Sequence, residues 1–371
     1  MEIKGIKYVS PLFDHSGYGS ASRGYVLALH NAGIPLTVAP VSFEKDKSDL
    51  GRDYSVLRSL VNKPIDYNVV IVHLTPEHYE RFIEDDKFNI GYTVWETNKL
   101  HPTWPDYVNK MGAVMVACDW NVDVFKECGV DIPIFKVPHG IDIAEYGNIR
   151  PYTIKGVDKD AYIFYNINQF TERKNIPLLL KSYWSAFCNN ENVALVLKTY
   201  ILDSSAEDKE RIRNIISVLK SSLVLDNYPP VYFIHGMLDR DEILGLHKTG
   251  NCLVSLDRGE GFSLTPFEAG AIGNPIIVTG IGGVLEYAKQ DNSYLVDCNL
   301  EPVFNMNWCP WYKGDQMWAT PNSGQAINFM KEVYNNRVAA TERSTKLKKF
   351  IFDNLKWEDT SKIIVDAINS I

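Results

Sequence analysis

Short apolar runs rich in Val and Ile alternate with longer amphipathic stretches along most of this 371-residue chain. Short runs of this kind, bounded by turn residues, are typical of buried strands. Apolar strands separated by helices indicate a parallel sheet that is covered on both faces. The predicted strands span residues 6–10, 35–41, 67–74, 89–95, 113–118 and 132–138, then 162–168, 193–200, 230–236, 251–257 and 275–280.

The strand pattern is interrupted at residues 139–159, where Gly, Pro and charged residues follow no clear period. Such a composition is typical of a linker, and a chain of this length accommodates two domains. The sequence therefore predicts an α/β protein with two Rossmann-like, doubly wound parallel-sheet domains that face each other across a cleft. The predicted domains are residues 1–145 and 146–350, with a C-terminal helix over 351–371 that packs back toward the first domain.

Composition excludes several classes of protein. The 38 basic and 46 acidic residues give a net charge of −8, which disfavours nucleic acid as a partner without excluding a local basic groove. No apolar run approaches the roughly 18 residues of a spanning helix, and residues 1–10 resemble a strand rather than a signal sequence. Six cysteines without a C-x-x-C pair indicate free thiols. We therefore expect a cytoplasmic protein without an integral membrane segment; peripheral association with a membrane stays open.

The stretch EGFSLTPFE, from Glu260 to Glu268, follows a predicted strand and leads into a helix beginning near Thr265. Ligands of doubly wound sheets bind beyond the carboxyl ends of the strands, and the free N–H groups of a helix start attract phosphate. A carboxylate at Glu268 could accept hydrogen bonds from the vicinal hydroxyls of a ribose, with Glu260 projecting beyond the phosphates. Taken singly, either glutamate is more simply explained as a helix-end or loop acid.

A second motif, TERKN, spans Thr171 to Asn175 directly after the predicted strand 162–168. Arginine can clamp a diphosphate with two hydrogen bonds and lysine adds a point charge. Arg173 and Lys174 are therefore candidates for neutralising a diphosphate, although an isolated Arg-Lys pair at a helix start is usually solvated.

Together, the two glutamates with seven residues between them, the A-G-A-x-G-x-P-I-I sequence that follows and the R-K-N motif resemble the donor site of retaining GT-B glycosyltransferases, in particular glycosyltransferase family 4 (glycosyl transferases group 1). The resemblance implies that Glu268 holds the nucleotide ribose and that Glu260 lies beside the transferred sugar. It further implies that Arg173 and Lys174 bind the diphosphate. Backbone contacts to the sugar and diphosphate are implied for Gly261, Phe262, Ser263, Leu264 and Thr265.

The resemblance also assigns the remaining donor contacts of the second domain. Many members of the family carry an arginine where this chain has Asn168, six residues before Lys174. We therefore expect a diphosphate clamp with one cation fewer, for which Arg173 compensates. Gly236 and Met237, at the end of the predicted strand 230–236, match the loop that borders the nucleobase.

A glycine-rich segment, His15 to Arg23 (HSGYGSASR), follows the first predicted strand. It does not fit the dinucleotide fingerprint, because the glycine after Gly19 comes five residues later instead of three. A nicotinamide enzyme is therefore disfavoured. The resemblance instead implies a first loop that faces the cleft, in which Gly17 and Gly19 contact the donor.

The resemblance implies that Glu96 lies near the reacting sugar. Many members of the family have a histidine just after the corresponding strand of the first domain, whereas this chain has Glu96 there and His101 five residues later. We expect Glu96 to contact the sugar or the acceptor. A loop acid satisfied by its neighbours is an equal alternative.

Two D-x-D sequences, at 158–160 and 239–241, resemble the metal–nucleotide motif of the other glycosyltransferase fold. The second precedes a predicted helix, where aspartate is an ordinary cap, and the first lies in the linker, where aspartate favours turns. We assign both to structure and expect no metal and no other cofactor.

The resemblance thus implies retaining, metal-independent transfer of a hexosyl group from a UDP- or GDP-linked sugar to a hydroxyl of a glycan, a lipid-linked or another acceptor, as in polysaccharide biosynthesis. The first domain would hold the acceptor and the second the nucleotide sugar. The expected catalytic residues are Glu260, Glu96, Lys174 and Arg173. Two alternatives remain: a binding protein of the same fold without catalysis, and glycosylation of DNA or a small molecule.

Overall fold

The computed structural model describes residues 1–43, 53–188, 191–203 and 205–371. The chain divides into two compact units. The first consists of Met1–Ala144 with Phe352–Ile371, and the second of Glu145–Ile351. Each unit contains a six-stranded sheet, and the strand pairs of both sheets are parallel. The predicted fold class, two doubly wound α/β domains, is therefore confirmed.

The sheet of the first unit has the strand order β2-β1-β3-β4-β5-β6. Because β2 lies on one side of β1 and all later strands lie on the other, the order reverses between β1 and β3. This is the position at which open α/β sheets bind ligands. The strands are β1 (Ile6–Ser10), β2 (Leu36–Pro40), β3 (Val69–His73), β4 (Phe88–Tyr92), β5 (Ala113–Val116) and β6 (Ile134–Lys136).

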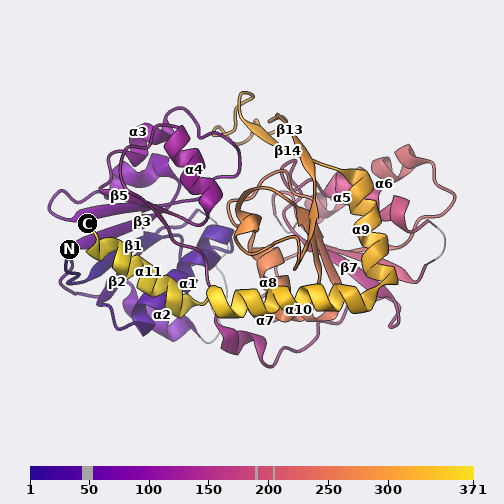
Figure 1. Ribbon diagram of the computed structural model, residues 1–371, viewed down its shortest axis with the longest axis horizontal. Helices are drawn as coiled ribbons and strands as arrows, with labels where there is room; N and C mark the ends of the chain where they lie inside the picture. Colours follow the sequence, from indigo (N-terminus) through magenta and orange to yellow (C-terminus); the bar gives the residue numbers. More distant parts are fainter. Residues whose placement is uncertain (44–52, 189–190, 204) are drawn as a thin grey trace. The chain divides into compact units, whose positions relative to one another are not determined.

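The helices of the first unit include one from the far end of the chain. The helix α11 packs against α1, and Figure 1 shows the two termini close together, where the Met1 amino group donates to the Asn369 carbonyl at 3.0 Å. A Cβ at Gly24 would lie 1.9 Å from the Trp357 ring, so only glycine allows this packing. The helices are α1 (Gly17–Asn31), α2 (Tyr54–Leu60), η2 (Pro76–Phe82), α3 (Trp104–Val108), α4 (Asp119–Glu127) and α11 (Trp357–Asn369), with η3 (Ile143–Tyr146) at the unit boundary.

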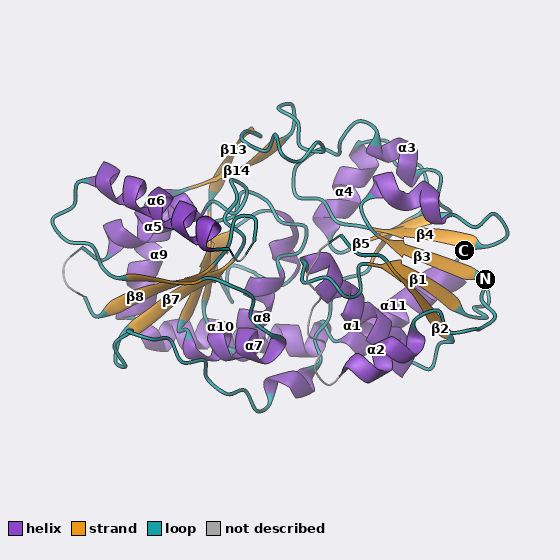
Figure 2. Ribbon diagram, turned by 180° about the vertical axis from the view of Figure 1, so that it is seen from behind, coloured by secondary structure: helices purple, strands orange, loops and turns teal. Residues whose placement is uncertain are grey.

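The sheet of the second unit has the order β12-β11-β10-β7-β8-β9, which reverses between β7 and β10. Figure 2 shows this sheet between two helical layers, with α5, α6 and α9 on one face and α7, α8 and α10 on the other. The strands are β7 (Tyr162–Ile167), β8 (Val193–Lys198), β9 (Val231–Ile234), β10 (Cys252–Ser255), β11 (Ile276–Thr279) and β12 (Tyr294–Val296). The helices are α5 (Ile176–Ala186), α6 (Ala206–Leu223), α7 (Arg240–Thr249), α8 (Leu264–Ile272), η4 (Gly282–Glu286), α9 (Ser323–Asn335) and α10 (Arg337–Asn354).

One element of the second unit departs from the sequence expectation. An antiparallel pair, β13 (Cys298–Pro302) and β14 (Met317–Pro321), precedes α9 in a region for which the sequence predicts no strand. Most residues of β13 are exposed, and Asn299 and Glu301 interrupt its apolar residues, so the strand has no apolar run by which it could be recognised.

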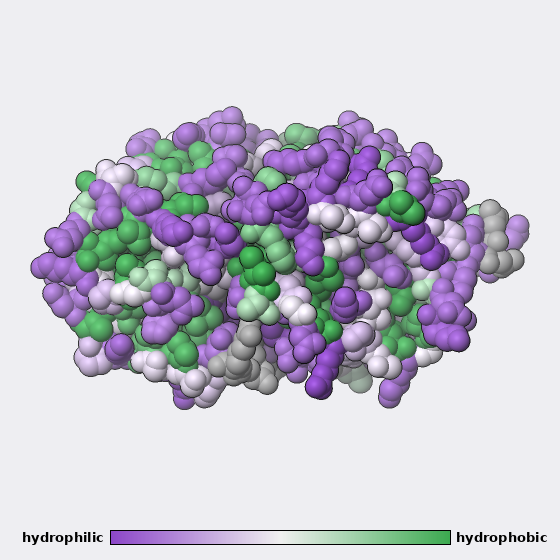
Figure 3. Space-filling view, turned by 60° about the horizontal axis from the view of Figure 1, so that its bottom comes forward, coloured by the Kyte–Doolittle hydropathy of each residue, from purple (hydrophilic) through white to green (hydrophobic). Residues whose placement is uncertain are grey.

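Large apolar side chains that reach the surface are scattered over both units, among them Met237, Trp308 and Val338. On the face shown in Figure 3, hydrophilic residues cover most of the surface and the hydrophobic ones form small, separate groups. None of the helices in the described ranges is both long enough and apolar enough to cross a bilayer.

Candidate functional site

The loops after β7 and β10 meet where the strand order of the second sheet reverses. The backbone N–H of Arg258 donates to the Arg173 carbonyl at 2.8 Å and thereby joins the two loops. Beneath this contact, the Asn168 amide donates to the Ser255 hydroxyl at 3.0 Å. The two motifs that the sequence places at separate strand ends therefore form one continuous surface.

Arg173 and Lys174 both bind the carboxylate of Glu260. Its Oε1 accepts from Arg173 at 2.5 Å and from the Lys174 ammonium at 2.6 Å, and all three side chains are less than one-fifth exposed. Burial by itself raises the pKa of Glu260, but the two cations outweigh it and the pKa is lowered. Two candidate phosphate ligands and the candidate sugar ligand are thus in direct contact, and a diphosphate has to compete with Glu260 for the two cations.

A further carboxyl group, Asp257, lies beside this cluster and was not identified from the sequence. It accepts from the Ser255 hydroxyl at 2.7 Å and from the Asn168 amide at 3.3 Å. Burial raises its pKa to about 6, opposed by the charge of Lys174 and assisted by that of Glu260. Its position two residues after the end of β10 could have identified it from the sequence as a candidate site residue. Asn168, which the sequence predicts to contact the donor, is 8% exposed. Its side-chain amide donates to these two neighbours.

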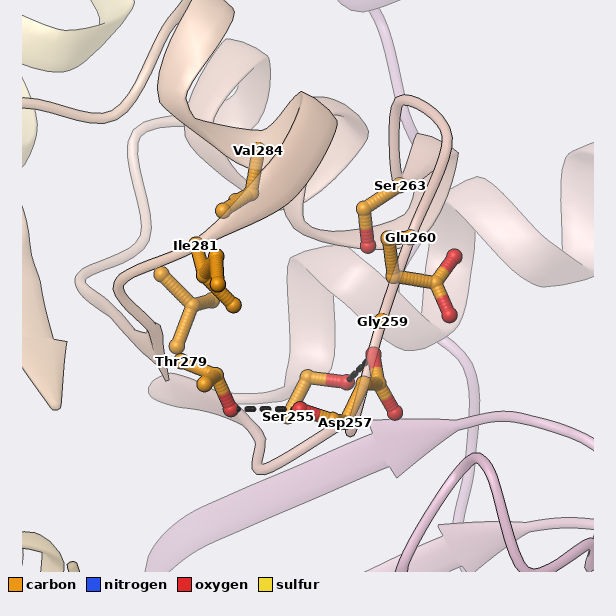
Figure 4. A pocket seen from close by; sticks show the side chains of 9 residues that line it. Ser255, Asp257, Gly259, Glu260, Ser263, Thr279, Ile281 and Val284 are labelled. Carbon is orange, nitrogen blue, oxygen red and sulfur yellow. Dashed lines mark hydrogen bonds between the residues drawn. The ribbon is translucent and has the colours of Figure 1, made fainter. Parts of the chain in front are cut away.

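A small pocket opens next to this carboxyl group. Figure 4 shows it between the Glu260 loop and η4, with the Glu260 carboxylate pointing away from Ile281 and Val284. The Thr279 hydroxyl donates to the Asp257 carbonyl at 2.7 Å and fixes the floor. The lining residues are Ser255, Asp257, Gly259, Glu260, Ser263, Val278, Thr279, Ile281 and Val284.

Helix α8 begins directly after this loop. Its N-cap residue, Ser263, has φ 70°, a left-handed conformation that is costly for a residue other than glycine. The Tyr287 hydroxyl donates to the Ser263 carbonyl at 2.6 Å. Phe262 is buried against Phe267 and Tyr287. Packing therefore holds the strained turn in place, and the helix N-terminus that it positions can attract an anion.

Glu268 lies in the second turn of α8 and is 9% exposed. One oxygen binds the Arg240 guanidinium, and the other is 3.4 Å from His247 Nε2. Arg240 also binds Glu145 at 3.0 Å. Burial raises the pKa of a carboxyl, but Arg240 and His247 outweigh it and bring that of Glu268 down to about 2. The group is ionised at neutral pH, and a carboxylate has further lone pairs for sugar hydroxyls.

Gly236 and Met237 follow β9 in a turn that leads to α7. Gly236 has φ 114°, which favours glycine, and the Met237 side chain is 43% exposed. Asp239 caps α7 in a capping box with Glu242, as predicted from the sequence. In the linker, Asp158 accepts from the Asp160 backbone N–H at 2.7 Å within an exposed turn.

The remaining candidates belong to the first unit. Gly17 and Gly19 open α1, where a Cβ at Gly19 would lie 2.2 Å from the Asp14 carbonyl and one at Gly17 would meet nothing within 4 Å. Between them, the Tyr18 hydroxyl hydrogen-bonds with Thr93 Oγ1 at 2.8 Å. This bond joins the glycine-rich loop to the segment of the half-buried Glu96. Burial raises the pKa of Tyr18, and the charge of Glu96 adds to the effect.

We expect Gly283→Ala to lower the free energy of unfolding of the second unit by about 1–3 kcal/mol. The new Cβ would lie 2.1 Å from the Gly261 carbonyl oxygen, so the Glu260 loop would have to move. Urea unfolding measures the change. Gly314→Ala is the matched control, because a Cβ there meets nothing within 4 Å and the residue is not among those with positive φ. Equal stabilities of the two variants would contradict the prediction.

Comparison with known proteins agrees with the motifs. Residues 153–302 match the family model described as glycosyl transferases group 1, which confirms the resemblance seen in the sequence. A protein of Sulfolobus islandicus rod-shaped virus 1, described as uncharacterized protein 356, is 23% identical over 287 residues, which is 75% of this chain and 75% of that protein.

Solved structures share the fold. Sucrose-phosphate synthase from Thermosynechococcus elongatus has a TM-score of 0.67 and 14% identity, over 99% of this chain and 98% of that one. HepE from Anabaena, in complex with UDP and glucose, has a TM-score of 0.66 and 12% identity, over 99% and 100%. TarM from S. aureus has a TM-score of 0.57 and 17% identity over 80% of this chain, but this chain covers only 54% of TarM. The fold is GT-B.

Proposed function

We propose that this chain, whose residues 153–302 carry a glycosyl transferases group 1 domain within a GT-B fold, transfers a hexosyl group from a nucleoside diphosphate sugar to an acceptor hydroxyl. The observation that carries the proposal is the cluster of Arg173, Lys174 and Glu260 at the reversal of strand order. Two cations beside the start of α8 can bind a diphosphate. Glu268 is ionised one turn further on and can accept from ribose hydroxyls.

We propose UDP as the nucleotide of the donor. HepE has been solved with UDP-glucose, and TarM with UDP and α-GlcNAc-glycerol. In the proposed complex Gly236 and Met237 border the base, and the backbone of Gly261 to Thr265 contacts the diphosphate and sugar. Glycan or other hydroxyl acceptors are proposed to bind the first unit, where Gly17, Gly19 and Glu96 remain the candidate contacts.

The proposed reaction breaks the bond between the anomeric carbon and the β-phosphate oxygen. Arg173, Lys174 and the start of α8 stabilise the charge that develops on the leaving diphosphate. The acceptor oxygen forms its bond to the anomeric carbon on the face from which the diphosphate departs, through an oxocarbenium-like state. The acceptor proton passes to the departing phosphate, so configuration is retained and no covalent enzyme intermediate forms.

We propose that the transfer needs no metal ion, since these cations can carry the charge of the leaving group. No group of three or more His, Cys, Asp or Glu side chains that could hold a metal occurs within the described ranges. We expect EDTA to leave the transfer rate unchanged and the product to keep the anomeric configuration of the donor, as measured by proton NMR. Loss of activity in EDTA with recovery in Mn²⁺, or an inverted product, would contradict this.

The test of the function itself is product formation with UDP-, GDP- and ADP-sugars and a panel of hydroxyl acceptors. A reaction without acceptor separates transfer from hydrolysis of the donor. If the chain binds UDP-sugars but forms no product with any acceptor, it is a binding protein of this fold.

A further inference from the structure

Lys198, the last residue of β8, is a buried cation that no motif identified. Its side chain is 7% exposed, and its ammonium lies over the ring of Tyr200 at 5.1 Å from the centroid. Within the described part of the chain, the ammonium makes no hydrogen bond or ion pair. Burial lowers the pKa of this lysine. Lys198 thus differs from Lys174, which is buried to a similar degree but bound to Glu260.

The direction of Lys198 follows from the alternation of side chains along β8. Leu195 and Leu197 belong to the core beneath α5 and α9, so Lys198 projects from the opposite face of the sheet. Tyr165 of β7 lies on that same face, where its hydroxyl meets His247 at 2.9 Å. His247 in turn lies against Glu268. Lys198 and the candidate ribose ligand therefore share one face of the sheet, near the carboxyl ends of its strands.

Lys198 is too far from the start of α8 to serve the same phosphate as that helix. Neighbouring strands lie about 4.8 Å apart, and β8 is two strands from β10, which gives a lateral offset of roughly 10 Å. Arg173, Lys174 and the start of α8 serve the diphosphate, and Glu268 the ribose. Lys198 lies farther along the same face of the sheet, so it would contact the remaining part of the nucleotide, which is the base.

A structural role does not explain an ammonium at this position. The face of the Tyr200 ring is the one contact described for this charge; a buried ammonium without a hydrogen-bond acceptor is still costly, and methionine would fill the same space with a similar unbranched stem. The cost is recovered if a ligand supplies an acceptor, and strongly perturbed buried groups are for this reason candidates for functional sites. An ammonium has three donors and no acceptor. Uracil and guanine offer keto oxygens, whereas the exocyclic group of adenine is an amino donor.

We propose, on the premise of the function above, that Lys198 donates a hydrogen bond to a keto oxygen of the donor nucleobase and thereby selects uridine or guanosine diphosphate over adenosine diphosphate. Selection of the base is then separate from binding of the diphosphate. Lys198 at the end of β8 selects the base, and the loops after β7 and β10 bind the diphosphate.

The test is calorimetric titration of the full chain with UDP, GDP, ADP and inorganic pyrophosphate. We expect the wild type to bind UDP or GDP at least about tenfold more tightly than ADP. Lys198→Met should weaken the preferred nucleotide by about 10- to 100-fold, leave ADP within about twofold and leave pyrophosphate unchanged. Lys174→Met should weaken all four ligands, pyrophosphate included.

Thermal unfolding distinguishes a folding defect from lost recognition, because Lys198→Met removes a buried charge that has no hydrogen-bond acceptor, keeps an apolar side chain against Tyr200 and should not lower Tm. The proposal is overturned if Lys198→Met weakens pyrophosphate as much as UDP, if it leaves the preference over ADP intact, or if its main effect is a lower Tm. If the wild type binds none of the three nucleotides, the proposed function itself fails.

Discussion

Replacing Lys174 by methionine is expected to lower kcat/KM for sugar transfer by about 100- to 1,000-fold, the usual effect of removing one group that stabilises a developing oxyanion. The Lys174 side chain is 14% exposed and lies at the reversal of strand order, where the leaving diphosphate is proposed to form. The fold should survive, because Arg173 remains bound to Glu260 at 2.5 Å. Initial rates with saturating acceptor and varied donor measure the effect. Lys181→Met, an exposed lysine on α5, is the matched control.

Whereas Lys174→Met should weaken the binding of the product UDP, Glu260→Gln should strengthen it. Because Glu260 holds both cations in the free protein, its neutral replacement releases them and UDP should bind about tenfold more tightly. Turnover should nevertheless fall, because the contact to the sugar is lost. A Lys174→Met variant with the native kcat/KM, or a Glu260→Gln variant that binds UDP more weakly, would contradict the assignment of these residues to the diphosphate and sugar.

Mild acid is expected to destabilise the first unit while stabilising the second. His139 lies 2.9 Å from the Tyr25 hydroxyl, and burial lowers its pKa to about 3. Burial, with a smaller effect of His139, lowers the pKa of His73 well below the ordinary value. A lowered histidine pKa gives stability that is present above the unfolded value of about 6.5 and lost as the pH falls. At about pH 4.5, His139 alone accounts for a loss of about 3 kcal/mol.

Asp257 has the opposite effect on the pH dependence of stability. Its pKa of about 6 lies above that of an unfolded aspartate, so the folded state binds the proton first. Protonation of Asp257 by itself therefore stabilises the second unit by about 2 kcal/mol between about pH 7 and pH 4.5, and the lowered pKa of Glu260 opposes part of this gain. Glu268 has a pKa of about 2. The stability that its ionised form gives to the second unit is lost mainly as the pH falls below the pKa of an unfolded glutamate, about 4.3.

Two buried thiols report each unit separately. Cys118 in the first unit is 1% exposed and Cys252 in the second is 0% exposed. Labelling during urea unfolding, with an acid-tolerant disulfide reagent and mass spectrometry, should show Cys118 reacting at lower urea in acid and Cys252 at higher urea. His139→Asn cannot titrate and should reduce the shift at Cys118. A shift of both thiols in the same direction would contradict the prediction.

The sequence predicted those features that arise within one loop or one strand. Arg173 and Lys174 are adjacent, and EGFSLTPFE is continuous, so residue type and position after a strand sufficed to locate them. Arg240 was missed as the partner of Glu268, because the contact joins α7 to α8 and depends on helix packing. Lys198 reads as part of an apolar strand, and only the alternation of side chains against a known core shows which face it occupies.

The return of the chain to its first unit has a consequence for synthesis. Residues 352–371 emerge from the ribosome after the whole of the second unit, yet they supply Trp357, Ile364 and Ile368 to the packing of the first. The second unit is one uninterrupted stretch and can close its core while translation continues. The order in which the units are completed is therefore the reverse of the order in which they begin. A nascent chain halted before residue 352 would carry a complete second unit and an incomplete first unit, in which the apolar face of α1 is uncovered.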